Sequence, residues 1–160
     1  WQPEEQDPPV IKERNIFQVL VNSNNQLLVE DEEMEIEELR QAAVEFIDNG
    51  GGTGDEACDF CQGPGDASSS VNPQKAIISL VNNRGTEYGT YIAVQNELVA
   101  AYNQLRDREA QRLFGTSFTA MEAKYNDSRT SEGAKETLKE RIELIKDMIP
   151  QKLSEAEPTS

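Results

Sequence analysis

The sequence predicts an α+β fold, a small mixed β-sheet with helices packed on one face, in the order β-β-α-β-α-(α)-β. Three observations predict it. Short apolar, β-branched runs are bounded by turn residues, longer segments repeat apolar residues at three- and four-residue spacing, and a Gly/Ser/Cys-containing stretch separates the two halves. That stretch, residues 48–74, is predicted to be an insertion loop in one domain of residues 16–155.

Two strands near the start of the domain are predicted to form a hairpin. Residues 16–21 read Ile-Phe-Gln-Val-Leu-Val, and residues 26–29 read Gln-Leu-Leu-Val after the turn cluster Asn-Ser-Asn-Asn. Residues 76–82, which begin Ala-Ile-Ile-Ser-Leu-Val, supply a third strand. A short closing strand is expected near residues 151–155, so the sheet combines a hairpin with strands that return after helices.

Two main helices are predicted from apolar periodicity. The first follows an acidic run, because seven of the nine residues 30–38 are Asp or Glu, and carboxylates at a helix N-terminus are favoured by roughly 0.3–1 kcal/mol each. The second helix begins near Gly89 and ends before Gly115. The apolar positions of the two helices are Ile36, Leu39, Ala43, Phe46 and Ile47, and Tyr91, Val94, Leu98, Ala101 and Leu105.

The more polar C-terminal part predicts two further helices. One is a short helical piece, for which Thr119 and Glu122 offer a capping box. Another is expected after Gly133 and before Pro150. Their apolar positions are Phe118, Met121 and Tyr125 in the first, and Leu138, Ile142, Ile145 and Met148 in the second.

The insertion contains the pair Cys58 and Cys61, for which three states are open. A disulfide suits an oxidising compartment and contributes at most about 2 kcal/mol by the chain-entropy estimate. Free thiols are the second state, and a metal site is the third. The carboxylates that such a metal site would recruit are Asp48, Asp55, Glu56, Asp59 and Asp66. We assign no function to the pair, so replacing both cysteines with serine is expected to loosen only the insertion.

Charge and residue types exclude several classes of function. The chain has 30 acidic and 15 basic residues, a net charge of −15, which repels nucleic-acid phosphates and anionic membrane surfaces. Because there is no histidine, the Ser-His and Cys-His arrangements of nucleophilic catalysis cannot be built, and neither a GxGxxG nor a Walker loop is present. We therefore expect a non-enzymatic protein with no catalytic residue, no cofactor, no metal ligand and no nucleic-acid partner.

Five segments of the chain resemble parts of a known family. The passage 84–98, from the third strand into the second main helix, is one of them, and residues 90–102 are the most specific part of the resemblance. Taken together, the segments resemble the periplasmic domain of the ExbD/TolR family of biopolymer-transport proteins, over about residues 8–158. The five segments are 8–22, 26–30 with the helix that follows, 75–80, 84–98 and 154–158.

This resemblance implies an accessory subunit of a TonB-ExbB-ExbD-type energy-transduction complex, which couples the proton gradient to outer-membrane transport. The domain would lie in the periplasm, joined by an extended linker of residues 1–15 to an inner-membrane helix expected before residue 1. Its partners would be an ExbB-like membrane subunit, a TonB-like protein and a second copy of the chain. Residues 156–160 would be an acidic tail, while the insertion and the helix at 131–148 depart from shorter family members.

Two segments are candidate partner-binding elements. An exposed edge strand can accept an extended segment through main-chain hydrogen bonds, and a proline-containing N-terminal segment can dock its bases reversibly on acids. Two alternatives stay open, a TolR-like peptidoglycan-binding module and a calcium-binding interaction module. The candidate residues are Lys152, Leu153 and Ser154 in the edge strand, and Pro8, Pro9, Lys12 and Arg14 in the N-terminal segment.

Overall fold

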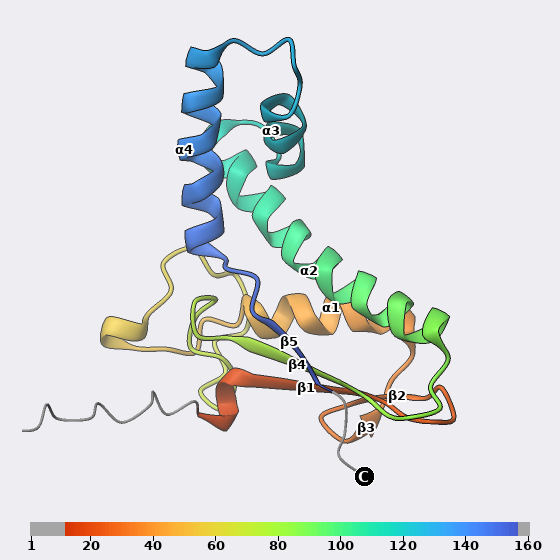
Figure 1. The fold of residues 1–160 in the computed structure, drawn as a ribbon. Helices are drawn as coiled ribbons and strands as arrows, with labels where there is room; N and C mark the ends of the chain where they lie inside the picture. The colour runs from red at the N-terminus through yellow and green to blue at the C-terminus, as the bar shows by residue number, and fades with distance from the viewer. Residues whose placement is uncertain (1–11, 157–160) are drawn as a thin grey trace, which may run out of the picture.

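The structure, a computed structural model, describes residues 12–156. It contains a five-stranded mixed sheet with α1 and α2 on one face (Figure 1), which confirms the predicted α+β class. The elements are η1 (Glu13–Asn15), β1 (Ile16–Val21), β2 (Leu27–Val29), β3 (Glu32–Glu33), α1 (Ile36–Ile47), η2 (Gly54–Glu56), β4 (Ile77–Asn82), α2 (Tyr88–Phe114), α3 (Phe118–Tyr125), α4 (Glu132–Met148) and β5 (Leu153–Ala156).

The sheet has the order β3-β2-β1-β4-β5, with β1 at its centre. β1 pairs antiparallel with β2 and parallel with β4, and β4 pairs parallel with β5. Parallel neighbours need long connections, which are supplied here by α1 with the insertion and by α2 to α4. In register across the sheet, Val19 pairs with Leu80, and Leu80 pairs with Glu155, so these three side chains share the helix-covered face.

The main apolar core lies between the sheet and helices α1 and α2. In β1, Phe17, Val19 and Val21 are buried while Gln18 is exposed, the alternation of a strand with one covered face. The rings of Phe17 and Phe46 lie 5.1 Å apart, which ties the sheet to α1. Of the ten apolar positions predicted on the two main helices, Ile36 and Tyr91 are partly exposed and the other eight are buried: Leu39, Ala43, Phe46, Ile47, Val94, Leu98, Ala101 and Leu105.

A second, smaller core lies in a helical arm, which we define as residues 106–148. The 27 residues of α2 span about 40 Å at 1.5 Å per residue, so this helix extends beyond the sheet, as Figure 1 shows. α3 and α4 pack against its far part. The buried residues of this second core are Ala110, Phe118, Met121, Leu138, Ile142 and Ile145.

The acidic run at residues 30–38 is only partly a helix start. Glu30 and Asp31 have positive φ angles of 51° and 66° and form a two-residue turn between β2 and β3. Turns with positive φ at both central residues match the twist of a hairpin. Only Glu37 and Glu38 lie in the first turn of α1, so the prediction is wrong for the first half of the run.

The starts of the two later helices also differ from prediction. α3 is capped by Ser117, whose hydroxyl accepts a hydrogen bond from the N–H of Ala120, so the capping box at Thr119 and Glu122 is wrong. α4 begins before Gly133 rather than after it, because Ser131 caps that helix in the same way. A serine oxygen at the N-cap satisfies a backbone N–H that the helix itself leaves free.

Candidate functional site

The two edges of the sheet differ in length and charge. One edge is β3, whose two residues Glu32 and Glu33 are both exposed. A very short, acidic edge strand discourages pairing with another chain. The other edge is β5, which is four residues long and in which Ser154 and Glu155 are exposed. β5 is therefore the edge at which a further strand can add.

β5 uses only one side of its backbone within the sheet. Ile78 donates its N–H to the carbonyl of Lys152 at 2.9 Å, and β5 pairs in parallel with β4 along its whole length. In a parallel ladder, successive residues direct their N–H and C=O groups alternately to the two sides. Leu153 and Glu155 therefore direct these groups away from β4, toward the position that an added strand would occupy.

One flank of α2 lies above β5. The carboxylate of Glu155 accepts hydrogen bonds from the hydroxyl of Tyr91 and from Nε2 of Gln95, both at 2.6 Å. Burial, and then this hydrogen bond to a carboxylate, raises the pKa of Tyr91 to about 12. The opposite flank of α2 faces α1, where Arg40 and Glu97 form an ion pair at 2.9 Å.

Apolar side chains on the β5 flank of α2 are incompletely covered. Tyr88, Ile92 and Val99 are spaced three or four residues from one another or from Gln95, so they lie on the same flank. Tyr88 is 78% exposed, and Ile92 and Val99 are partly exposed. A strand added to β5 would place alternate side chains beneath them. We name this surface the α2–β5 site, made of Tyr88, Ile92, Val99, Leu153 and Glu155.

The face of the sheet that lies opposite the helices is also partly exposed. Leu20 pairs with Leu28 on one side and with Val81 on the other, so these side chains form an apolar row across three strands. Ile16 and Ile77 form a second pair on this face. All five residues are partly buried, which leaves the row accessible without making it a deep groove.

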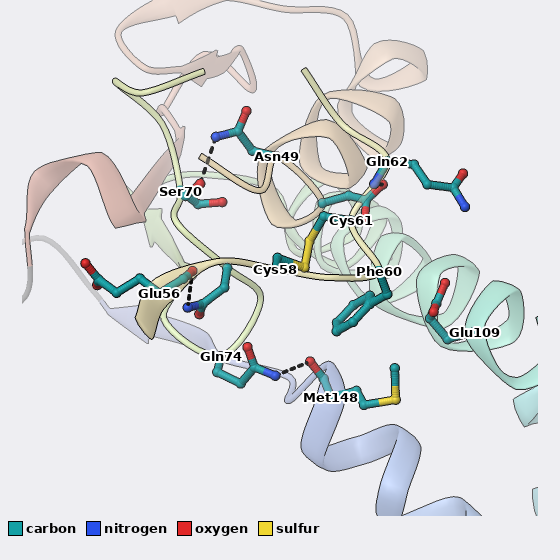
Figure 2. The surroundings of a disulfide bond; sticks show 12 residues. Asn49, Glu56, Cys58, Phe60, Cys61, Gln62, Ser70, Gln74, Glu109 and Met148 are labelled. Atoms are coloured by element: carbon teal, nitrogen blue, oxygen red, sulfur yellow. Dashed lines mark hydrogen bonds between the residues drawn. A yellow bond between two sulfur atoms is a disulfide. The ribbon is translucent and has the colours of Figure 1, made fainter. Parts of the chain in front are cut away.

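Buried amide side chains order the insertion of residues 48–74 and join it to the rest of the domain. Asn49 donates to the carbonyl of Ser70 at 2.7 Å (Figure 2) and to the carbonyl of Asp66 at 2.9 Å, and it accepts a hydrogen bond from the N–H of Asp66. Asn15 accepts the N–H of Val71 at 2.9 Å. These bonds satisfy backbone groups that have no partner in a helix or strand, so the insertion is part of the packed fold.

Cys58 and Cys61 form a disulfide within the insertion (Figure 2). Of the three states that the sequence left open, the structure contains this one. Asp48, a candidate ligand for a metal, instead forms an ion pair with Arg108 at 2.7 Å. Between residues 12 and 156, no three His, Cys, Asp or Glu side chains are grouped so that they could hold a metal ion.

A charged network, which we name the joint, lies where the arm meets the rest of the fold. Arg108 donates to both oxygens of Asp48 at 2.7 and 2.9 Å and to Glu109 at 2.8 Å, and Arg112 binds the other oxygen of Glu109 at 2.7 Å. Hydrogen bonds to Asp48 raise the pKa of Arg108, whereas burial lowers the pKa of Arg106. Arg106 donates a hydrogen bond to the carbonyl of Ile149, the residue after α4, at 2.9 Å. The joint consists of Asp48, Arg106, Arg108, Glu109 and Arg112.

The predicted N-terminal binding segment differs from expectation where the structure describes it. Its two prolines lie outside the described residues. Lys12 is exposed, but Arg14 donates to two backbone carbonyls of the insertion, at 2.7 and 3.2 Å, rather than docking on acids. The extended linker is wrong for residues 13–15, which form η1, because Asn15 is buried as an acceptor for the insertion.

Sequence reasoning located the edge strand but missed the features around it. Leu153 and Ser154 lie in β5, and Lys152 immediately precedes it. The flank of α2 gave no separate signal in the sequence, because its apolar residues alternate with the core-facing apolar residues of the same long helix. The joint gave none either, because its acids are scattered among many others, although an Asp directly after a buried helix and an Arg-Glu pair inside another are the residue types to examine.

Comparison with protein-family models and with curated proteins gives no match. In the part of the chain that the structure describes, no helix is both long and apolar enough to span a membrane. The function must therefore be argued from the α2–β5 site, the joint and the resemblance carried by the sequence.

Proposed function

We propose that this chain is a non-enzymatic subunit of a TonB-ExbB-ExbD-type energy-transduction complex, and that its α2–β5 site binds an extended segment of a TonB-like protein. The observation that carries the proposal is the difference between the two sheet edges. β3 is short and acidic, whereas β5 directs backbone groups away from β4, to a side on which no other described strand pairs with it, beneath an incompletely covered apolar flank. Such an edge gives affinity through main-chain hydrogen bonds and specificity through alternate side chains.

The resemblance supplies the identity of the complex. The segments that carry it fall largely on β1, β2, β4, β5 and the first half of α2, which belong to the sheet half rather than to the arm. In a protein of this kind the domain lies in the periplasm, an ExbB-like subunit holds the preceding membrane helix, and two copies of the chain associate. The insertion and α4 are then additions to a shared sheet-and-helix unit.

Charge indicates what the bound segment is like. The chain carries a net charge of −15, and Glu155 lies within the α2–β5 site. A partner segment with basic residues beside alternating apolar ones would be attracted over a distance and then held by the ladder. The same charge weakens association with a second acidic copy, so the pairing of two chains relies on apolar contact or on the neighbouring membrane subunit.

Site-specific photo-crosslinking in the native cell envelope tests the proposal. A photoreactive residue at Ser154 should crosslink to a TonB-like protein, identified by mass spectrometry. The matched control is the same residue at Glu32, which is also exposed but lies on the short acidic edge β3, and it should give no such product. Equal crosslinking from both positions contradicts the proposal. If there is no specific crosslink and the chain co-sediments with sacculi, the peptidoglycan-binding alternative is supported.

A further inference from the structure

The disulfide lies where the insertion meets the two halves of the molecule. Cys58 and Cys61 close a ring with a sequence separation of 3, and Asp59 and Phe60 are the residues inside it. The Phe60 ring packs against the main apolar core. In Figure 2 it lies beside the disulfide and is directed toward the helices that carry Glu109 and Met148.

The backbone of the same residue reaches the joint. The carbonyl of Phe60 accepts a hydrogen bond from Nη2 of Arg108 at 3.3 Å. That guanidinium also donates to both oxygens of Asp48, at the end of α1, and to the buried Glu109 on α2. One cation therefore connects the disulfide ring, α1 and the base of the arm, and a change in the ring alters its set of partners.

The rest of the insertion is held independently of the disulfide. Asn49 and Asn72 bind backbone carbonyls within it, and Gln74 donates to the carbonyl of Met148 at 3.0 Å. Opening the ring would therefore be a local event that leaves the loop attached. Both cysteines are partly exposed, so an external thiol can reach them.

We propose that Cys58–Cys61 is a redox-responsive site, and that its reduction by a dithiol loosens the joint and frees the helical arm to move. A thiolate of the dithiol attacks one sulfur of the disulfide and forms a mixed disulfide, and the second thiol of the reductant then resolves it. The chain gains two electrons and two protons and becomes a dithiol, while the reductant becomes a disulfide. The inference concerns the joint and stands apart from the proposed function.

The size of the effect follows from chain entropy. A four-residue ring restricts the unbound states of Phe60, and opening it is expected to raise the equilibrium constant for local detachment about 20-fold. Detachment of Phe60 removes one acceptor from Arg108 and exposes its contact with the core. The residues that bind Arg108 on α1 and α2 should then open more often, whereas among the described residues no hydrogen bond joins β1 or β4 to residues 58–61.

Hydrogen–deuterium exchange of the intact chain, with and without excess dithiothreitol, tests the inference. We expect reduction to speed amide exchange at residues 46–49 and 106–112 by about tenfold to 20-fold, where the upper figure is the entropy estimate. Exchange in β1 and β4 should change little. A change confined to residues 57–62 overturns it. A disulfide that stays oxidised in the native chain under dithiothreitol overturns it as well.

Two variants keep the test specific. Cys58→Ser with Cys61→Ser should show the faster exchange at the joint without reductant and no further response to dithiothreitol, in contrast to the expectation from sequence that only the insertion loosens. Phe60→Ala, with the disulfide intact, should reproduce the faster exchange at residues 106–112, because Phe60 is the contact that the ring positions. If Phe60→Ala leaves that segment as protected as in the parent chain, the ring does not act through the joint and the proposal fails, even should the serine variant not fold.

Discussion

The sheet half and the helical arm are held by different kinds of interaction. In the sheet half, strands and helices share one apolar core that includes Val19, Leu80 and Leu98. In the arm, six buried residues form a separate core. The halves are linked by the continuous helix α2, by Met148, which packs against both cores, and by the charged joint. Apolar burial has no preferred direction, whereas charged hydrogen bonds depend on geometry. The cores therefore stabilise the fold, and the joint adds directional contacts at the base of the arm.

The two regions also differ in the surfaces that they present. The open β5 edge and the incompletely covered flank of α2 both belong to the sheet half. The arm has no sheet edge, and its exposed apolar side chains Leu113 and Leu144 are 40% and 46% exposed on separate helices. Partner binding by strand addition should consequently depend on the sheet half alone, while the arm should modulate it only through the joint.

The largest expected effect is the loss of a buried side chain in the sheet half. Leu98→Ala should lower the free energy of unfolding by ~2–5 kcal/mol, because Leu98 is fully buried between α2 and the sheet. Urea denaturation followed by circular dichroism measures it. The control is Leu144→Ala on the arm, where 46% exposure predicts a change within about 0.5 kcal/mol. Equal losses in the two variants would contradict the comparison.

Alkaline pH should weaken the sheet half through Tyr102. Burial raises the pKa of Tyr102 to about 12, so the unfolded chain releases the phenolic proton at lower pH than the folded one. Stability is full below about pH 10 and falls by roughly 2–3 kcal/mol as pH rises to about 12. Urea denaturation at several alkaline pH values measures this fall.

The hydroxyl of Tyr102 also accepts a hydrogen bond from the N–H of Lys152 at 3.3 Å, which joins the start of β5 to α2. Tyr102→Phe should therefore reduce the fall in the free energy of unfolding at alkaline pH, because the ring is kept and the titrating hydroxyl is removed. Tyr88→Phe, at a position 78% exposed, is the matched control for the chemistry of the change. An alkaline loss that is identical in the parent chain and in Tyr102→Phe would show that Tyr102 does not supply it.

Neutralising the joint should have an intermediate effect. Glu109 is fully buried and binds both Arg108 and Arg112, so Glu109→Gln leaves two guanidinium groups with a weaker partner. We expect a loss of about 2 kcal/mol, measured by urea denaturation, with faster hydrogen exchange in the arm than in the sheet. Glu136→Gln, at an exposed position on α4, is the control and should change little. A uniform loss of protection across both halves would mean that the joint is not a boundary.

The smallest effect is expected at the cap of α4. Ser131 accepts a hydrogen bond from the N–H of Ala134 at 3.3 Å, and Ser131→Ala should cost about 1 kcal/mol of helix stability. Hydrogen exchange should rise at the start of α4 and stay unchanged in β1 and β4. Ser128→Ala, in the preceding turn, is the matched control. Increased exchange in the sheet strands would show that the arm and the sheet unfold as one unit.

Local patterns were enough to predict most of the sheet half. The period-two burial of β1 and the helical spacing of α1 and α2 both follow from which side chains face the core. β3 was missed because its turn is Glu30-Asp31, whereas the residues that usually signal such a turn are Asn-Gly or Asp-Gly. The cap of α3 was misplaced by two residues, since Ser117 and Thr119 are equally suitable cap residues in sequence.

The candidate site was predictable only in part, because several of its contacts join distant positions. In the α2–β5 site, Tyr91 and Glu155 are 64 residues apart, and in the joint Asp48 and Arg108 are 60 apart, so no local pattern connects them. The insertion was expected to be a loop, and its close packing depends on buried amide contacts. The disulfide could be proposed from its spacing, but its link to Arg108 through Phe60 requires the three-dimensional fold.

Binding of a partner segment, followed by backbone amide chemical shifts, tests the central claim most directly. The labelled chain would be titrated with the purified periplasmic segment of the TonB-like protein from the same cell. We predict that the largest shifts occur at Leu153 and Glu155 and on the α2 flank at Ile92 and Val99, with no comparable change in α3 and α4. Shifts that centre on the arm, or on the β3 edge at Glu32 and Glu33, would contradict the assignment of the binding site to β5.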